Sequence, residues 1–307
     1  MSARPRWLLP AAFVLLGLIW GSSFAWIKIA VDEIPPATLV AWRMTLGAIG
    51  MLGLLAFVRV RWPRTAGEWL PLVVLGAINA AIPIFLISWG QQFVDSGTAA
   101  VLNSLVPIFS LVIAGLALRT EPVTALRVGG LVLGFIGAAL LASRELSLRA
   151  DASGFIGAMA VVLAAISYAL GASYARNRIG HSHRYIVAGG SLVFAAVDMW
   201  VVALVADGGI IVPRELDTLI AVAWLGLLGS FVAYVLFFFL IENIGATLTT
   251  MVTYIFPVVG VALGVLLLNE RMDARLAIGT ALVLAGIVVV GLRYDSGVSR
   301  EPGGLRE

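Results

Sequence analysis

Polar uncharged side chains occur within the long apolar stretches of this chain, together with tryptophan and tyrosine. Hydroxyl and amide groups donate and accept hydrogen bonds, and aromatic rings add an apolar wall. A few such groups in an otherwise apolar pocket suit a small zwitterion, such as an amino acid. The candidate binding residues are Trp20, Ser23, Asn79, Ser88, Trp89, Asn103, Tyr168, Tyr234, Thr253 and Tyr254. Serine and threonine are also ordinary in helix interfaces, so they have a structural alternative.

Two prolines interrupt apolar stretches that the pattern predicts to be helical, Pro107 and Pro257. A proline lacks the N–H that would bond to the carbonyl four residues earlier, here the carbonyls of Asn103 and Thr253. A freed carbonyl at membrane depth must be covered by protein or face a wet cavity. The pair therefore indicates either a solute path or two structural kinks.

Three charged residues lie more than two positions from the ends of the apolar stretches. Asp198 is near the middle of its stretch, where an ionisable group is costly and is a functional hypothesis by default. It could carry a coupling proton, or be protonated or paired within the bundle. Lys28 and Arg43 are nearer the ends of their stretches. We expect their long side chains to snorkel to the interface, with capture of a solute carboxylate as the alternative.

The residue types that catalysis requires are scarce at membrane depth. His181 and His183, the two histidines, fall in a connecting segment, so neither a serine–histidine hydrolase nor a zinc site can form within the apolar stretches. The sequence has no cysteine, no HExxH pair, no phosphate-binding loop with its lysine and no Gly-x-Ser-x-Gly elbow. We therefore expect neither an enzyme nor an ATP-driven pump, and no metal or cofactor.

Transmembrane helices are the elements that would position these residues. Hydrophobic residues make up 61% of the chain and charged residues 12%, which is too little polar surface for a soluble domain. Apolar stretches long enough to cross about 30 Å of hydrocarbon recur along the sequence. They predict ten helices, at residues 8–31, 37–58, 69–91, 97–118, 125–142, 154–174, 185–206, 217–240, 246–268 and 275–292. The first is too long for a typical signal peptide, so we keep it as a helix.

Arginines are distributed unequally between the two sides of these helices. With a cytoplasmic N-terminus, the inside segments hold Arg4, Arg6, Arg59, Arg61, Arg64, Arg119, Arg127, Arg176, Arg178, Arg184, Arg293, Arg300 and Arg306. The outside segments hold Arg144, Arg149, Arg214, Arg271 and Arg275. The positive-inside rule then places both termini in the cytoplasm of a bacterial-type inner membrane, although the segment from Glu242 to Gly245 adds no support. Orientation explains the net charge of +3 better than nucleic-acid binding does.

The second half of the sequence repeats features of the first at an offset of about 149 residues. The matched pairs are Pro107 with Pro257, Glu121 with Glu270, Gly130 with Gly279 and Gly137 with Gly286. A unit of five crossings ends on the opposite side from where it began, so the second unit is inserted upside down. We expect one repeat at 1–146, an inverted repeat at 147–296 and a cytoplasmic tail at 297–307.

Several motifs resemble EamA-type proteins of the drug/metabolite transporter superfamily. They are Trp20 to Phe24 followed by Lys28, then Ile34 to Pro36 and Arg43, then Pro107 leading to Arg119–Glu121, and Pro257 leading to Asn269–Arg271. The resemblance covers residues 10 to 292. It departs from the family pattern where the sixth helix reads Ser167 to Gly171 in place of the Trp-Gly-Ser run.

This resemblance implies a ten-helix exporter fold with a central cavity lined mainly by helices 1, 3, 4, 6, 8 and 9, with helices 5 and 10 peripheral. It also implies outward transport of amino acids or similar small metabolites. We therefore expect an alternating-access secondary transporter whose partners are a small-molecule substrate and membrane lipids, with no nucleic acid, and a monomer is compatible with the sequence. A lipid flippase, a receptor and a non-transporting scaffold are the alternatives.

Overall fold

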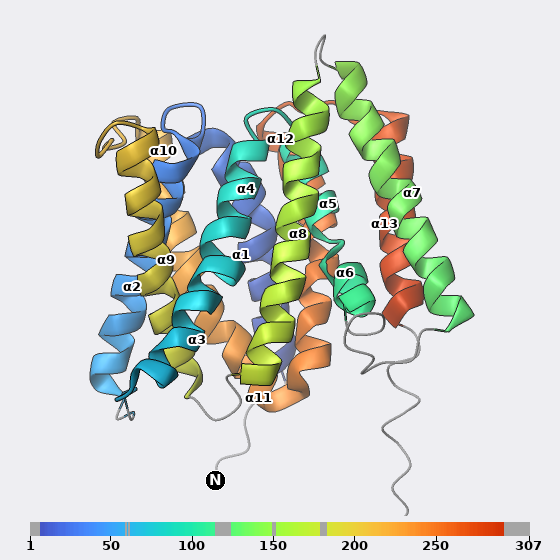
Figure 1. The fold of residues 1–307 in the computed structure, drawn as a ribbon. Helices are drawn as coiled ribbons and strands as arrows, with labels where there is room; N and C mark the ends of the chain where they lie inside the picture. The colour runs from blue at the N-terminus through green and yellow to red at the C-terminus, as the bar shows by residue number, and fades with distance from the viewer. Residues whose placement is uncertain are drawn as a thin grey trace, which may run out of the picture.

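Every regular element among the described residues is a helix. The computed structural model describes residues 7–58, 60, 62–113, 124–148, 152–178 and 183–291. A segment inside hydrocarbon must pair its own backbone N–H and C=O groups, and a helix does so without a partner strand. The helices run side by side in one bundle (Figure 1). The all-α prediction is therefore confirmed for these residues.

Seven helical stretches in the described part of the chain are long and apolar enough to cross a membrane. Five are uninterrupted: α1 (Leu8–Ala30), α2 (Pro36–Phe57), α7 (Ala125–Leu148), α8 (Ser153–Arg178) and α9 (Arg184–Ala206). Two contain a π-helical segment: α3 (Ala66–Gly76), η1 (Ala77–Ala81) and α4 (Ile82–Gly90), and then α10 (Leu216–Ala223), η3 (Trp224–Val232) and α11 (Ala233–Thr250). The shorter apolar stretches are α5 (Ser96–Asn103) with α6 (Val106–Val112), the 3-10 turn η4 (Met251–Tyr254) with α12 (Ile255–Leu267), and α13 (Ala274–Gly291).

Irregular turns interrupt the helices at matching places in the two halves of the sequence. The π-helical segments η1 and η3 are centred about 149 residues apart, which is the spacing of the sequence repeat. The break at Ser104 and Leu105 between α5 and α6 corresponds in the same way to η4. Single π-helical turns inside α-helices occur frequently at functional sites. We therefore expect a functional site near these irregular segments.

The two predicted kink prolines follow breaks of this kind. Pro107 lies in the first turn of α6, and Pro257 is the third residue of α12. Proline suits the first turn of a helix because its missing N–H would have no partner there. The regular helix is thus interrupted near both prolines. That they lie beside a solute path stays a prediction.

Helices α7 and α13 lie together at one edge of the bundle (Figure 1). A Cβ atom added to Gly137 on α7 would come within 2.8 Å of the carbonyl oxygen of Gly279 on α13. One added to Gly286 would come within 2.6 Å of the carbonyl oxygen of Gly130. The backbones of the two helices therefore touch, which explains glycine at these repeat-matched positions.

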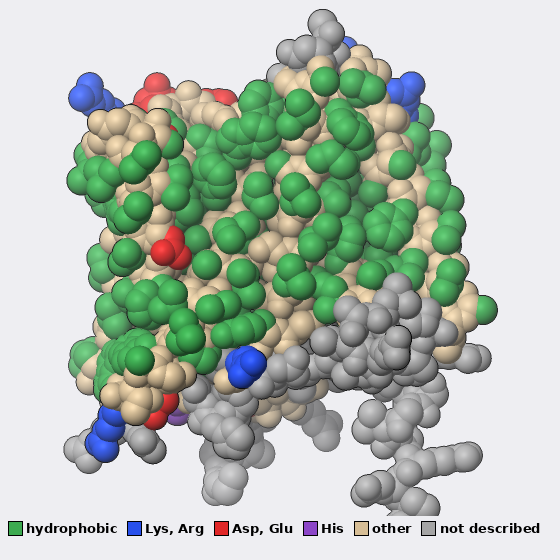
Figure 2. All heavy atoms as spheres, viewed as in Figure 1, with side chains coloured by type: hydrophobic (Ala, Val, Ile, Leu, Met, Phe, Trp, Pro, Cys, Tyr) green, Lys and Arg blue, Asp and Glu red, His purple; other side chains and the backbone are tan. Residues whose placement is uncertain are grey.

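Large apolar side chains cover the outside of the bundle. Leucine, isoleucine, valine and phenylalanine residues are exposed on helices throughout the chain, including Phe57 at 90% and Val205 at 82%. Figure 2 shows these hydrophobic side chains over most of the visible face, with charged side chains concentrated near its two ends. A soluble protein rarely exposes such a continuous apolar surface. The surface fits burial in lipid.

Several helix ends differ from the prediction. The helix expected at 125–142 continues to Leu148 as α7, so Arg144 lies within the helix and not in a connecting segment. The gap expected after residue 240 is also absent, because α11 runs to Thr250 and includes Glu242. Hydropathy ends a span at the first charged residue, whereas these helices include Arg144 and Glu242, both of which form ion pairs.

Some predicted features lie outside the described residues. They are the tail at 297–307, the Arg119–Glu121 turn, the end of the span expected at 97–118, the histidine His181, and the arginines Arg4, Arg6, Arg59, Arg61, Arg149, Arg293, Arg300 and Arg306.

Candidate functional site

Arg43 on α2 is buried inside the bundle, with only 6% of its side chain exposed. Its Nε atom donates a hydrogen bond to Ser230 Oγ in η3, at 3.2 Å. Its Nη2 atom is 3.6 Å from the position that a Cβ atom on Gly229 would take. The expectation that this side chain snorkels to the interface is therefore wrong. The backbone of Arg43 lies about 10 Å from the start of α2, at 1.5 Å per residue. Its side chain points toward the other half of the chain.

The charge of Arg43 has no carboxylate partner in the described part of the chain. The titratable groups that interact electrostatically with it are the hydroxyls of Tyr168 and Tyr234. Among the described residues Arg43 has the one hydrogen bond from Nε to Ser230, so its Nη1 and Nη2 donors have no described acceptor. Burying an ion costs several kcal/mol unless a counter-ion and hydrogen bonds compensate. A buried arginine without a carboxylate partner is unusual, and its remaining N–H donors are available to a ligand.

A ring of polar and aromatic side chains surrounds this arginine. Tyr234 lies close enough to the side chain of Asn79 in η1 for their polar groups to interact. The indole Nε1 of Trp20 donates to the carbonyl oxygen of Gly229 at 3.0 Å, and its ring meets that of Tyr234 edge-on at 6.3 Å. We call the set Trp20, Ser23, Arg43, Asn79, Tyr168, Ser230 and Tyr234 the Arg43 cluster.

The phenyl rings of Phe237 and Phe256 extend the cluster into an apolar wall. Their centroids lie 5.5 Å and 6.2 Å from the ring of Trp20. Aromatic rings at these distances attract each other and present large apolar area. The cluster thus combines one cation, several hydroxyl and amide groups, and an aromatic surface.

The π-helical segments η1 and η3 explain how the sequence builds this arrangement. Ser167 on α8 donates to the carbonyl oxygen of Ile78 in η1, at 2.6 Å. Ser230 donates to the carbonyl oxygen of Leu225, five residues earlier, at 3.1 Å. Side chains therefore satisfy carbonyls that the irregular helical bonding leaves available. The same segments carry Asn79 and Ser230 into the cluster.

Two glycines border cluster residues, and one of them, Gly171, is required for the packing. A Cβ atom on Gly171 of α8 would come within 2.6 Å of Asn79 Oδ1. A Cβ atom on Gly229 would come within 3.4 Å of Ser23 Oγ, which itself donates to the carbonyl oxygen of Ile19 at 3.1 Å. A larger residue at Gly171 would displace Asn79, whereas a Cβ atom at Gly229 would make ordinary van der Waals contacts.

Five of the ten predicted binding residues meet in the Arg43 cluster: Trp20, Ser23, Asn79, Tyr168 and Tyr234. Arg43 and Ser230 complete it and were not among those candidates. The signal for Arg43 was present, since an arginine within an apolar helix is a functional hypothesis by default. Ser230 gave no comparable signal, because serine is common in membrane helices.

The other five predicted binding residues lie on α4, α5 and η4. Among the described residues, no hydrogen bond or ring contact joins Ser88, Trp89, Asn103 or Tyr254 to the Arg43 cluster. The ring of Trp89 packs on Phe93, and Tyr254 donates a hydrogen bond to the carbonyl oxygen of Ile287 at 3.4 Å. The buried oxygens Ser88 Oγ and Asn103 Oδ1 have no described hydrogen-bond partner. Thr253 is partly buried in η4. A role in solute binding stays a prediction for all five.

Asp198 lies on a different face of the molecule. It is partly exposed on α9, one turn from Val201 and Val202, which are 57% and 39% exposed. Asp198 does not interact electrostatically with Arg43, Tyr168 or Tyr234. Its role in coupling stays a prediction, and any such role would act from outside the Arg43 cluster.

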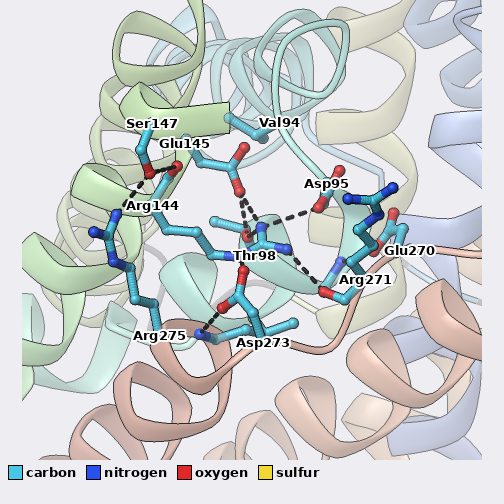
Figure 3. Close-up of polar contacts among 12 residues, drawn as sticks. Val94, Asp95, Thr98, Arg144, Glu145, Ser147, Glu270, Arg271, Asp273 and Arg275 are labelled. Carbon is cyan, nitrogen blue, oxygen red and sulfur yellow. Dashed lines mark hydrogen bonds and ion pairs between the residues drawn. The ribbon is translucent and has the colours of Figure 1, made fainter. Parts of the chain in front are cut away.

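A second buried arginine, Arg144 on α7, has a very different environment (Figure 3). It is 1% exposed and forms ion pairs with Asp95 at 3.0 Å, Glu145 at 2.7 Å and Asp273 at 2.8 Å. Its Nη2 atom donates to the carbonyl oxygen of Arg271 at 2.9 Å. Thr98 donates to Glu145 Oε1 at 2.6 Å. We call Asp95, Thr98, Arg144, Glu145 and Asp273 the Arg144 cluster.

Glu270 strengthens the same end of the bundle. Its carboxylate accepts hydrogen bonds from the backbone N–H groups of Ser96 and Gly97, at 2.6 Å and 3.0 Å, and so caps the N-terminus of α5. Asn269 has a φ of +55°, a left-handed conformation that asparagine tolerates better than most residues. This turn directs Glu270 back toward α5.

Lys28 ties α1 to the same end. Its Nζ atom donates to the carbonyl oxygens of Gln91 at 2.6 Å and Val94 at 3.0 Å, beyond the C-terminus of α4. Gln91 Nε2 donates in turn to the carbonyl oxygen of Phe24 at 2.8 Å. Lys28 therefore binds backbone carbonyls within the protein, and the expectation of snorkelling is wrong for it as well.

The opposite end of the bundle has a simpler connection. Arg184 at the start of α9 forms an ion pair with Glu242 on α11. Both side chains are partly exposed, so the pair is expected to contribute little to stability. Among the described residues, the extensive ionic network is thus at the end where α7 finishes and α8 begins.

Comparison with known proteins places this geometry among transporters. The model of the EamA-like transporter family matches residues 8–143 and again residues 155–292. The chain is 30% identical over 302 residues to an uncharacterized inner membrane transporter, YedA, of Escherichia coli, covering 94% of this chain and 93% of that protein. It is 25% identical over 298 residues to a probable amino-acid metabolite efflux pump of Escherichia coli, covering 93% and 96%. A crystal structure aligns with a TM-score of 0.65 at 20% identity, covering 94% and 98%, which shows a shared fold.

Proposed function

Because the chain belongs to the EamA-like transporter family, we propose that it is a secondary transporter that exports small metabolites, above all amino acids. The observation that carries the proposal is the Arg43 cluster, which is assembled from both family-matched segments. Trp20, Arg43 and Asn79 come from the first, and Tyr168 and Tyr234 from the second. A buried polar site between two halves is where a transporter of inverted repeats is expected to hold its solute.

We propose ten membrane crossings arranged as two inverted five-helix repeats, 1–146 and 147–296, with both termini in the cytoplasm of a bacterial-type inner membrane. Seven helices meet the length and hydropathy that a crossing requires. The three shorter apolar stretches, of 17 or 18 residues, would each span about 25 Å, which a slightly thinned bilayer accommodates. The matched irregular turns η1 and η3 support the repeat.

Alternating access would use the two ends of the bundle differently. The Arg144 cluster joins α5, α7 and the segment between α12 and α13 at the end that the proposed orientation places outside. Lys28 adds α1 and the end of α4 to this network, and Glu270 adds a second contact to α5. The conformation described here would therefore be closed at its outer end, and outward opening would require these contacts to separate.

A lipid flippase remains the second candidate, and one observation favours it. An apolar groove of about 400 Å³ runs beside α12 and α13 and is open at the side of the bundle. Its lining residues are Pro257, Val258, Val261, Ala262, Val265, Leu266, Met272 and Thr280. Such a groove could hold an acyl chain, but it presents no charged side chain for a headgroup.

The test is solute flux in proteoliposomes that contain the purified full-length protein. Amino acids loaded inside should exchange with labelled amino acid outside, and matched liposomes without protein should show no such exchange. Labelled phospholipid included in the same vesicles tests the flippase. Phospholipid movement without amino-acid exchange would favour the second candidate, and movement of neither would overturn the proposed transport.

Site-directed labelling tests the location of the site independently. The chain has no cysteine, so a single introduced cysteine is the only thiol. Cysteines at Asn79, Asn103 and Tyr254 should react with a water-soluble maleimide and be protected by a transported solute. A cysteine at Val201, which is exposed on the outside of α9, serves as the lipid-facing control. Failure of all three site cysteines to react or to be protected would contradict a solute path there.

Coupling to a proton gradient is proposed through Asp198. Replacing Asp198 with asparagine removes the titratable group and keeps its size. We expect gradient-driven accumulation of amino acid to be lost in this variant, while exchange without a gradient continues. Equal gradient dependence in the wild type and in Asp198→Asn would exclude this residue as the coupling group.

A further inference from the structure

Arg43 has a charge and hydrogen-bond donors that the described protein does not use. Its single hydrogen bond to a described residue is the one from Nε to Ser230, which leaves the two Nη atoms, with two N–H groups each, without a described acceptor. The side chain is nonetheless 94% removed from solvent, because its exposed fraction is 6%. A largely buried guanidinium binds an anion more strongly than an exposed one does, because the effective dielectric constant around it is lower.

From this arrangement we propose that Arg43 binds the carboxylate of the transported solute, which rests on the transport function proposed above. A guanidinium presents paired N–H groups that match the two oxygens of a carboxylate, and such bidentate pairs are the strong ones. One arginine with no described counter-ion matches one negative charge. The expected substrate class is therefore a small monocarboxylate or zwitterion.

The rest of the cluster fits the other parts of such a solute. The hydroxyls of Tyr168 and Tyr234 and the amide of Asn79 can accept hydrogen bonds from an ammonium group. The rings of Trp20 and Phe237, 5.5 Å apart, offer apolar area to a side chain. The carboxylate would therefore be the group required for binding, whereas the side chain would be tolerated over a range of apolar shapes.

The first arm of the test needs no mutation. The purified full-length protein is heated with L-phenylalanine, L-leucine or L-threonine, and separately with the carboxamide of each, which keeps the side chain and ammonium group but lacks the carboxylate. We expect at least one acid to raise the melting temperature and its amide to bind at least about 30-fold more weakly, the effect of leaving a buried charge unpaired. Amides that stabilise the protein as well as the acids do would overturn the proposal.

The second arm uses variants of the same full-length protein. Arg43→Gln should abolish the stabilisation by the acid, and Arg43→Lys, which keeps the charge without the bidentate fork, should retain a weak part of it. Arg214→Gln is the matched control because it removes one positive charge from an exposed position in the connection after α9. If Arg43→Gln does not fold, the comparison of acid with amide in the wild type still decides.

The outcomes separate this inference from the transport function. Acid-dependent stabilisation that requires Arg43, in a protein that moves none of these solutes, would support the carboxylate site and refute transport. Transport of amino acids and amides alike, unaffected by Arg43→Gln, would support transport and refute the site. Absence of stabilisation by all three acids would also refute the site.

Discussion

Arg43 and Arg144 are both almost fully buried, at 6% and 1% exposure, yet their surroundings are opposite. Arg144 has three carboxylates within 3.0 Å and uses all three of its nitrogen atoms as donors. Arg43 has one described hydrogen bond, to a serine, and only tyrosines as titratable neighbours. The first arginine is a structural connection, and the second has capacity left for a ligand.

The comparison shows that burial of a charge does not by itself identify a functional residue. A compensated buried charge stabilises one arrangement of helices, because removing any partner leaves the others unpaired. An uncompensated one costs stability, and a protein retains such a group where it serves binding or catalysis. The two arginines should therefore respond in opposite ways to the same substitution.

The largest expected effect is on the Arg144 cluster. Arg144→Gln would leave Asp95, Glu145 and Asp273 close together without their cation, which should lower the free energy of unfolding by about 3 kcal/mol. Thermal or denaturant unfolding of the purified protein in detergent measures this. The exposed control Arg214→Gln should change stability by less than about 0.5 kcal/mol. An Arg144→Gln variant as stable as that control would contradict the structural role assigned to Arg144.

The corresponding change at Arg43 should leave stability intact and remove function. Arg43→Met replaces an uncompensated buried ion by an apolar side chain of similar length, which is expected to be neutral or stabilising. Solute exchange in proteoliposomes should nevertheless fall to the level of liposomes without protein. A loss of stability as large as that in Arg144→Gln would show that Arg43 has a structural partner. The two arginines would then not differ in role.

A smaller effect is expected from the cap on α5. Glu270→Gln keeps the size of the side chain but removes the negative charge at the helix N-terminus. The loss should be about 1 kcal/mol of unfolding free energy. The same unfolding measurement applies, and a double variant with Arg144→Gln tests coupling between the two contacts. Strictly additive losses would indicate that the cap acts independently of the Arg144 cluster.

The smallest effect is a weakening of the Arg144 cluster in acid. The pKa of Asp273 lies below its ordinary value because the backbone N–H of Leu276 and the Arg144 guanidinium outweigh burial, which acts in the opposite direction and is the largest single influence. A carboxylate with a lowered folded-state pKa contributes stability above its ordinary pKa of 3.8 and loses it as the pH falls below that value. Melting temperatures from pH 6 to pH 3 should therefore drop less in Asp273→Asn than in the wild type.

The sequence determined the properties that depend on one segment at a time. The lengths of the apolar stretches predicted the helical class, and the described residues confirm it. The motifs around Trp20, Pro107 and Pro257 predicted the transporter family, which the family match confirms. The inverted orientation of the second half and the total of ten crossings stay predictions, because the hydropathy of a segment is the same whichever way the chain crosses the bilayer.

Only the tertiary structure decided which polar residues meet. Hydropathy describes a helix averaged around its axis, whereas burial of one side chain depends on how that helix is rotated and on neighbours far along the chain. Arg43 and Ser230 are 187 residues apart, and no local pattern connects them. Arg144 was predicted in a connecting segment and is instead the most completely compensated charge described. The sequence specified both arginines, but only the positions of their neighbours distinguish a structural arginine from a candidate ligand-binding one.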